Sequence, residues 1–356
     1  MKKKKLLILQ NEISAYNVPV YNIIGEHYEL TLGFYLKDKS KIECNFNKVK
    51  LDSRVIGPFT FIKGLRKIAS DYDVVSIIPN LRNPSYCLLP FLPHRNKIVN
   101  WSIGFRASYT NPYLTNRRHV FADRVFQSVL EHCDASIFYM EKAKEFWKKT
   151  DFDVSRVFVA PNTTQVMPIT IKPEIKKDFL FVGTLYKGKG LDLLLDAYRQ
   201  VVEKQNPENK LHIVGDGAER KALEEYVALQ NLSENVIFHG AIYDEKVLAD
   251  QFSHALLCIS PTQGGLSVPK SMGYGVPFVT RKDAITGGEI YHITPGVNGI
   301  MYDKDDDLLN ILSDACQNSQ KYIEMGVKAQ EYYNNNATVL HMAQGAMDAI
   351  EYVLNT

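Results

Sequence analysis

The sequence predicts an α/β protein built from two Rossmann-like domains. Its 356 residues exceed the roughly 150 of a typical domain about twofold. Short apolar runs alternate with amphipathic stretches along most of the chain, and the two halves carry opposite net charge. Strands that alternate with helices of about 10–15 residues are typical of βαβ units around a parallel sheet.

The first half contains apolar runs bounded by polar residues, and an amphipathic stretch at 120–133 that we expect to be a helix. The expected strands are residues 4–10, 28–36, 73–79, 97–103, 134–139 and 156–162.

The second half repeats the alternation more clearly. The expected strands are 178–183, 210–217, 236–240 and 256–261, and the expected helices are 191–205, 218–230 and 244–255. We expect an N-terminal domain at 1–165, a C-terminal domain at 166–335, and a last helix at 336–356 that packs back on the first domain.

Composition excludes several protein classes. With 45% hydrophobic and 23% charged residues, the chain is typical of a globular protein. No apolar run reaches the roughly 18 residues that span a bilayer, and the start "MKKKKLLILQ" has too few apolar residues for a signal peptide. Five cysteines without a CxxC spacing indicate reduced thiols and no zinc site. We therefore expect a cytoplasmic protein.

The charge is divided unevenly. Residues 1–165 carry a formal charge of +10 and the remainder −8. A basic first half suits an anionic substrate or peripheral contact with the lipid headgroups of the cytoplasmic membrane face. Solvated surface lysines are the alternative.

A glycine-rich junction follows the predicted strand at 178–183. The stretch "FVGTLYKGKGLDLLL" reads GxxxxGK from Gly183 to Lys189, but Gly190 stands where a P-loop needs Ser or Thr for magnesium. Glycines at a helix start, with Lys187 and Lys189 beside them, still favour a phosphate site. An ordinary glycine turn with solvated lysines is the alternative.

Two further junctions have the same strand–glycine–helix form. "VGDG" ends at Gly217, and "TQGGLSVPKSMGYGVPFVT" places Gly264 and Gly265 before a short helix for which Ser267 is the expected N-cap. The backbone N–H groups of Gly265, Leu266 and Ser267 are expected to face the crevice at the carboxyl ends of the strands. Convergence of these junctions indicates a nucleotide-diphosphate site.

Together these stretches resemble the donor domain of the family 4 glycosyltransferases. The resemblance covers residues 178–305 through "VGTLYKGKGLDLLLDAY", "LHIVGDGAERKALEEY", "NVIFHGAI" and "CISPTQGGLSVPKSMGYGVPFVT", with "GGE" and "GVNGIMYD" following. It implies the GT-B fold, with two Rossmann-like domains facing each other across a cleft. It also implies retaining sugar transfer from a nucleotide-sugar without a bound metal.

The resemblance assigns residues to the donor. Lys189 stands where a family lysine neutralises the diphosphate, and Gln263 and Lys270 stand for a pair of glutamates that bind the sugar and the ribose hydroxyls. We expect Lys270 to pair with phosphate or with Glu289, a structural ion pair being the alternative. Thr184 replaces a usual arginine. The expected donor-binding residues are Gly183, Thr184, Lys187, Gly215, Gly240, Ala241, Ile242, Gly264, Gly265, Leu266, Ser267 and Glu289.

The first half is expected to bind the acceptor. Trp101, Ser102, Gly104 and Arg106 follow a predicted strand, in the loop that faces the cleft in this fold. A core position for Trp101 is the alternative. The apolar stretch "CLLPFLP" (87–93) and the basic charge suit a lipid-diphosphate-linked acceptor.

These observations predict a retaining glycosyltransferase of surface-polysaccharide biosynthesis. We expect a UDP- or GDP-sugar as substrate, a glycan or lipid-linked glycan as acceptor, and no cofactor, metal or nucleic acid. Two alternatives stay open: an inactive GT-B homologue that acts as a binding or scaffold subunit, and a GT-B-fold nucleotide-sugar epimerase.

Overall fold

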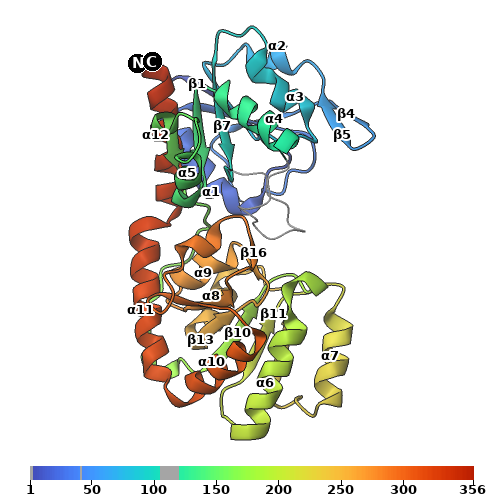
Figure 1. Cartoon of the computed structure of the whole chain (residues 1–356), viewed down its shortest axis with the longest axis vertical. Coiled ribbons are helices and arrows are strands. Elements are labelled where there is room, and N and C mark those ends of the chain that lie inside the picture. The colour runs from blue at the N-terminus through green and yellow to red at the C-terminus, as the bar shows by residue number, and fades with distance from the viewer. Residues whose placement is uncertain (1–2, 41, 105–119) are drawn as a thin grey trace. The chain divides into compact units, whose positions relative to one another are not determined.

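The chain consists of two compact α/β units (Figure 1). The computed structural model describes residues 3–40, 42–104 and 120–356. Of these, residues up to 162 and Val339–Thr356 form the first unit, and Thr163–Thr338 form the second. Within the described residues, each unit holds one main parallel sheet, of seven strands in the first and six in the second. The predicted α/β class with two Rossmann-like sheets is confirmed.

The sheet of the first unit grows outward from β1 on both sides. Its order is β3-β2-β1-β6-β7-β8-β9, and all neighbours are parallel. The strands are β1 (Lys5–Leu9), β2 (Glu29–Phe34), β3 (Asn47–Lys50), β6 (Val74–Ile77), β7 (Lys97–Ser102), β8 (Ala135–Phe138) and β9 (Val157–Val159). The chain runs from β1 out to β3 and returns to β6, so the topological switch point lies between β1 and β6.

Helices and one separate hairpin complete the first unit. The helices are α1 (Val18–His27), α2 (Leu65–Ala69), α3 (Pro84–Leu88), α4 (Val120–Glu131), α5 (Glu141–Trp147) and α12 (Val339–Asn355). Strands β4 (Ser53–Ile56) and β5 (Phe59–Ile62) pair only with each other.

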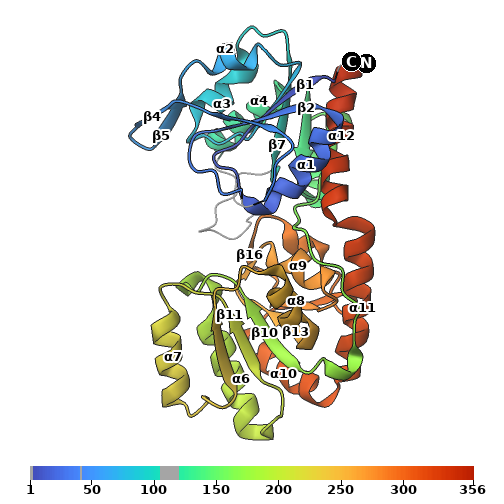
Figure 2. The same ribbon diagram turned by 180° about the vertical axis from the view of Figure 1, so that it is seen from behind.

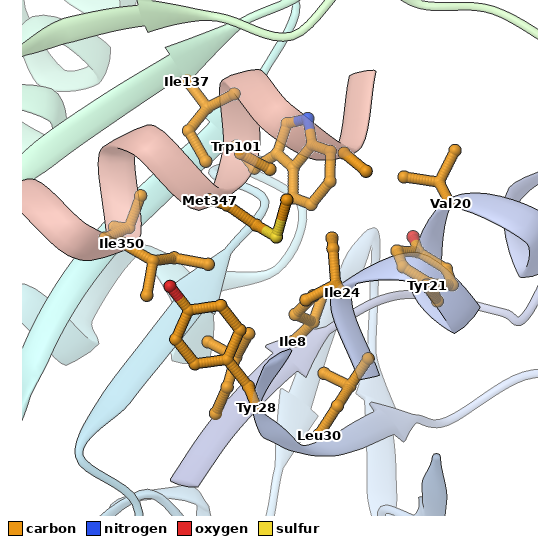
Figure 3. Close-up of a cluster of buried hydrophobic side chains, with 14 of the residues drawn as sticks. Ile8, Val20, Tyr21, Ile24, Tyr28, Leu30, Trp101, Ile137, Met347 and Ile350 are labelled. Atoms are coloured by element: carbon orange, nitrogen blue, oxygen red, sulfur yellow. The ribbon is translucent and has the colours of Figure 1, made fainter. Parts of the chain in front are cut away.

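Helix α12, at the end of the chain, completes the core of the first unit. Its Met347 and Ile350 lie among side chains of α1 and of the sheet, including Ile8 and Ile137 (Figure 3). A Cβ at Gly345 would lie 2.0 Å from the carbonyl oxygen of Val159 in β9. The helix therefore lies directly on the strand backbone.

The sheet of the second unit is also wound in two directions. Its order is β12-β11-β10-β13-β15-β17, again parallel. The strands are β10 (Asp178–Val182), β11 (Leu211–Val214), β12 (Val236–Gly240), β13 (Ala255–Ile259), β15 (Phe278–Arg281) and β17 (Gly299–Tyr302), and a short pair joins β14 (Gln263–Gly264) to β16 (Ile285–Thr286). The switch point lies between β10 and β13.

The helices of the second unit cover both faces of its sheet (Figures 1 and 2). They are α6 (Leu191–Gln205), α7 (Arg220–Leu229), α8 (Glu245–His254), α9 (Ser267–Gly273), α10 (Asp305–Gln317) and α11 (Ser319–Asn336). Aromatic and aliphatic side chains from α6 and α10, such as Tyr198 and Leu312, fill the core on one face. The predicted helices at 191–205, 218–230 and 244–255 agree with α6, α7 and α8.

We predict that Gly345→Ala destabilises the protein. Replacing a helical glycine by alanine ordinarily stabilises a helix by about 0.5–1 kcal/mol, but here the methyl group collides with the β9 backbone. Overpacking of this kind costs about 1–3 kcal/mol. Urea unfolding measures the change, with exposed Gln344→Ala as the neighbouring control. An unchanged or raised midpoint for Gly345→Ala would contradict the docking of α12 on β9.

Candidate functional site

Two loops meet at the switch point of the second unit: the loop after β10 (183–190) and the loop after β13 (260–266). The hydroxyl of Thr262 donates to the Gly188 carbonyl over 2.8 Å. Gly190 has φ 67°, and a Cβ there would lie 2.8 Å from Cγ2 of Thr262. Because ligands of open α/β sheets bind at this edge, the joined loops form the candidate site.

Lys189 brings a half-buried cation to these loops. Its Nζ lies 3.6 Å from the position of a Cβ on Gly183, at the end of β10. Burial lowers the pKa of Lys189, and the nearby Glu289 carboxylate opposes that shift. Glu289 is itself buried and accepts from Gly287 N at 2.8 Å and Thr286 Oγ1 at 3.0 Å. The site thus pairs a partly desolvated ammonium with a carboxylate held by its own loop.

Helix α6 starts at the same place. It spans 15 residues, begins directly after Gly190, and has no side-chain capping bond at that glycine. The N-terminus of a helix carries partial positive charge and exposes backbone N–H groups. Lys189 and the start of α6 therefore bring positive charge to this edge, next to the carboxylates of Glu289 and Asp192.

Tyr186 belongs to the site, and the sequence reasoning missed it. Its hydroxyl donates to Oε1 of Gln263, and its ring lies over Gly188 and 5.9 Å from Nζ of Lys189. Because the phenol holds the amide by its oxygen, Nε2 is the hydrogen-bond donor that Gln263 brings to the site. Apart from its position inside the glycine–lysine loop, nothing in the sequence indicated that this tyrosine belongs to the site.

The two adjacent glycines of the β13 loop differ in their surroundings. A Cβ at Gly264 would lie 2.3 Å from Cγ2 of Ile290, so packing against the 3-10 turn Glu289–His292 requires glycine there. A Cβ at Gly265 would meet no described atom within 4 Å. Internal packing therefore explains Gly264 but not Gly265.

The expected N-cap of α9 is wrong by one residue. The helix begins at Ser267 with Leu266 as its N-cap, and the structure shows no side-chain capping bond. Leu266 already has helical angles (φ −59°, ψ −14°), and the Val268 N–H donates to the Gly265 carbonyl at 2.9 Å. The helical turn therefore starts before Ser267.

The glycines of "VGDG" hold two loops together. A Cβ at Gly215 would lie 1.8 Å from the Gly183 carbonyl oxygen, and one at Gly217 would lie 2.2 Å from that of Leu185. The Leu185 N–H donates back to the Asp216 carbonyl at 2.9 Å. Close backbone packing requires both glycines, so they support the site without needing to touch a ligand.

A second cation, Arg220 at the start of α7, lies beside the loop after β12, and the sequence reasoning did not select it. Gly240 has φ 72°, and the guanidinium of Arg220 lies 3.1 Å from the position of its Cβ. Arg220 also donates to Glu224 at 2.8 Å. Ala241 is exposed and Ile242 is half-buried beside this charge. Thr184 and Lys187 are exposed in the neighbouring β10 loop.

Lys270 contacts Glu245 and not Glu289, so its position fits the structural ion pair that was the alternative. Its Nζ lies 2.7 Å from Oε1 of Glu245, the first residue of α8, and Tyr274 donates to Oε2 of the same carboxylate at 3.2 Å. The Lys270 side chain leaves α9 towards the start of α8, whereas Glu289 lies beside Lys189. A carboxylate thus stands next to Lys270.

The acceptor residues selected from the sequence lie in the first unit. Trp101 is 3% exposed and packs edge-on against Tyr21 at 6.3 Å (Figure 3), so the core alternative describes its position. Ser102 is buried and accepts from Gly104 N at 3.2 Å, and the Gly104 carbonyl accepts from Trp147 Nε1 at 2.7 Å. Arg106 lies outside the described residues.

A chain of polar side chains crosses the opposite part of the second sheet. His212 stacks on His239 with a 2.8 Å Nδ1···Nε2 contact, and its other nitrogen lies 3.4 Å from Asp178. A cavity of about 210 Å³ opens beside Asp178 and His254, at the amino ends of the strands. This cavity is separate from the glycine loops, which follow the carboxyl ends.

The described residues contain neither a metal-ligand cluster nor a membrane-spanning helix. Among residues 3–40, 42–104 and 120–356, no three His, Cys, Asp or Glu side chains gather in a way that could hold a metal ion. Within the same ranges, no helix combines the length and apolarity that crossing a bilayer requires.

Comparison with known families matches the second unit. Residues 176–318 match the family "Glycosyl transferases group 1". An uncharacterised glycosyltransferase of Haemophilus influenzae is 27% identical over 207 residues, which are 57% of this chain and 52% of that protein. The lipopolysaccharide 1,6-galactosyltransferase of Salmonella typhimurium is 28% identical over 172 residues, 44% of this chain and 46% of that protein. The matched part is about half of each relative's length.

Solved structures share the whole fold. The Anabaena protein Alr3699/HepE in complex with UDP superposes with a TM-score of 0.72 at 16% identity, covering 98% of this chain and 100% of that one. The lipopolysaccharide outer core galactosyltransferase WaaB gives 0.69 at 15% identity, covering 98% and 99%. The chain has the GT-B fold, and residues 176–318 match a glycosyltransferase family. The predicted GT-B fold and the predicted resemblance to glycosyltransferases of this fold are thereby confirmed.

We predict different effects on stability for alanine at Gly264 and at Gly265, the two glycines of the loop after β13. Gly264→Ala is expected to lower the free energy of unfolding by about 1–3 kcal/mol, because its methyl group overlaps Ile290. Gly265→Ala is expected to change it by less than about 0.5 kcal/mol, as surface substitutions do. Urea unfolding of the two variants measures both values. Equal destabilisation would mean that Gly265 also packs against the protein.

Proposed function

We propose that this GT-B protein is a retaining glycosyltransferase of surface-polysaccharide biosynthesis. It would move a sugar from a UDP- or GDP-sugar to a glycan or lipid-linked glycan, in peripheral contact with the cytoplasmic membrane face. The observation that carries the proposal is the half-buried Lys189 at the switch point, beside the uncapped start of α6 and the open side of Gly265. The Salmonella relative named for galactosyl transfer and the UDP complexes of the Anabaena protein support this substrate class.

The chemistry assigned to these residues is electrostatic. As the bond from sugar to diphosphate breaks, negative charge grows on the leaving phosphate oxygens. The Lys189 ammonium and the N–H groups at the start of α6 would stabilise that charge. Stabilisation of this kind by preorganised donors is usually the largest single contribution to catalysis. Gln263, oriented by Tyr186, would donate through Nε2 to the sugar. The acceptor hydroxyl would attack on the face that the leaving group vacates.

Activity on a donor panel tests the proposal. The purified protein is incubated with UDP- and GDP-sugars and with glycan or lipid-diphosphate-linked acceptors, and products are identified by mass spectrometry. A glycosylated acceptor with retained anomeric configuration is expected. Release of an epimerised nucleotide-sugar without acceptor would favour the epimerase alternative. Nucleotide binding without any transfer would favour the scaffold alternative.

We predict that Lys189→Ala weakens nucleotide-diphosphate binding by about 1.5–3 kcal/mol, the range for hydrogen bonds to charged groups. Affinity for the nucleoside without phosphate should stay the same, because the lysine is assigned to the diphosphate. Isothermal titration with UDP, GDP and the nucleosides measures this. Lys221→Ala, which removes a charge from exposed α7, is the matched control. Unchanged diphosphate affinity for Lys189→Ala would refute the assignment.

We predict that transfer persists in excess EDTA. Lys189 and the start of α6 supply positive charge that a divalent cation supplies in other transferases. Initial rates with EDTA and with added Mg²⁺ or Mn²⁺ measure the effect. Loss of activity in EDTA with recovery on adding either cation would show that a metal participates.

Glu245 is proposed to replace the missing second glutamate. In the related glycosyltransferases a carboxylate at the position of Lys270 binds the ribose hydroxyls, and here Lys270 instead holds the Glu245 carboxylate at 2.7 Å. The oxygens that accept hydrogen bonds from the ribose would thus come from Glu245 on α8, while Lys270 fixes their position. Glu245 stands three residues after Ile242, the last of the expected donor-binding residues at 240–242.

We therefore predict that Glu245→Gln weakens UDP or GDP binding by about 0.5–1.5 kcal/mol, the net value of a typical hydrogen bond. It should leave the affinity for the 2′,3′-dideoxynucleotide unchanged. Titration of both nucleotides against both proteins gives the difference directly. Exposed Glu225→Gln on α7 is the control. An equal loss for both nucleotides would assign Glu245 a purely structural role.

A further inference from the structure

The hairpin of β4 and β5 exposes apolar side chains that the proposed donor chemistry does not use. Val55 is 69% exposed, Ile56 52%, Phe59 42% and Phe61 36%. The hairpin lies outside the main sheet and projects from the first unit in both views (Figures 1 and 2). Exposed apolar clusters of this kind mark interaction sites.

The strand register places three of these four side chains, those of Ile56, Phe59 and Phe61, on one face. Arg54 pairs with Phe61, and Ile56 pairs with Phe59. Paired residues share a face, and so do residues two apart on a strand, so Ile56, Phe59 and Phe61 lie together with Arg54 at their base. The turn between the strands is Gly57-Pro58, with Gly57 at φ 57°, which fits a tight two-residue hairpin turn.

The base of the hairpin is anchored while its tip is not. Ile62 is buried, and its N–H donates to Ser85 Oγ of α3 at 2.8 Å. Thr60 N donates to the Arg82 carbonyl at 2.8 Å. A Cβ at Gly57 would meet no described atom within 4 Å. The fold thus holds an apolar tip away from its own core.

The charge around the tip is almost entirely positive. Residues 53–70 contain Arg54, Lys63, Arg66 and Lys67 and no acidic residue. Lys63 pairs with Asp52 at 2.8 Å. In the described part of the chain, no ion pair joins Arg54, Lys67 or Arg82 to a carboxylate. An apolar tip beside these three cations is complementary to a bilayer with anionic headgroups.

The segment next to the hairpin continues this character. Helix α3 contacts β5, and from its end onward Leu88, Phe91 and Leu92 are exposed while Leu89 is buried. These residues belong to "CLLPFLP", which the sequence analysis associated with a lipid-linked acceptor. The apolar surface therefore extends from the hairpin to α3.

We propose that the β4–β5 hairpin is a lipid-binding wedge that inserts Ile56, Phe59 and Phe61 into an anionic membrane surface. This inference deepens the proposed membrane contact by assigning it to one element. It is independent of the donor site, because the hairpin and the glycine loops belong to different units. Anionic lipid would be bound whether or not nucleotide is present.

Co-sedimentation of the full chain with vesicles tests the wedge, without nucleotide. Vesicles of phosphatidylglycerol in phosphatidylcholine are compared with phosphatidylcholine alone. The triple variant Ile56→Ser/Phe59→Ser/Phe61→Ser is expected to lower the partition coefficient at least about tenfold, because burying one large apolar side chain alone is worth that much. Arg54→Gln and Arg82→Gln are expected to lower it about fivefold per charge on anionic vesicles only.

The matched control is Leu229→Ser/Leu340→Ser, which removes exposed apolar side chains from α7 and α12 and should leave partitioning unchanged. As a second readout, Phe59→Trp places a tryptophan at the tip, whose emission is expected to shift to the blue with anionic vesicles. Equal partitioning of wild type and triple variant, or no shift, would overturn the proposal. So would a wild-type dimer in vesicle-free sedimentation that the triple variant reduces to monomer, since a second copy would then cover the face. A failed nucleotide titration would leave this result untouched.

Discussion

The candidate site of the second unit depends on close contact between loops that follow neighbouring strands. The loop after β11 lies so close to the loop after β10 that a Cβ at Gly215 would overlap the Gly183 carbonyl at 1.8 Å. The loop after β13 is joined in turn through Thr262 and Gly190. Side chains are excluded from the first of these contacts, whereas the Thr262 side chain makes the second. Lys189 and the start of α6 take their positions from these joined loops.

This constraint also explains why glycines in the same region differ in meaning. Gly215, Gly217 and Gly264 are required by packing within the protein, and a ligand is not needed to account for them. No described atom lies within 4 Å of the Cβ position of Gly265, so a molecule outside the chain can approach its backbone there. The positive potential from Lys189 makes an anion the fitting occupant. A glycine-rich motif thus combines residues that build the site with residues that face its ligand.

Two lysines of the second unit each lie near a carboxylate. The family resemblance predicts a carboxylate at the position of Lys270, and α8 brings Glu245 to 2.7 Å from the Lys270 ammonium. Lys189 remains half-buried, with Glu289 held by Thr286 and the Gly287 N–H nearby. At both places one cation thus lies near one carboxylate. Because charge acts through space, a carboxylate on a neighbouring helix can stand beside such a lysine.

The sequence by itself determined the α/β class, the alternation of strands and helices, and the glycine junctions, because hydrophobic period and glycine position are local properties. It missed β3 and the β4–β5 hairpin, whose short, partly polar strands carry no clear alternation. Only the tertiary structure decided the partner of Lys270, the role of Tyr186 over Gly188, and the core position of Trp101. It also decided that α12 lies on the first unit. These outcomes depend on which distant segments meet, and residue spacing along the chain does not contain that information.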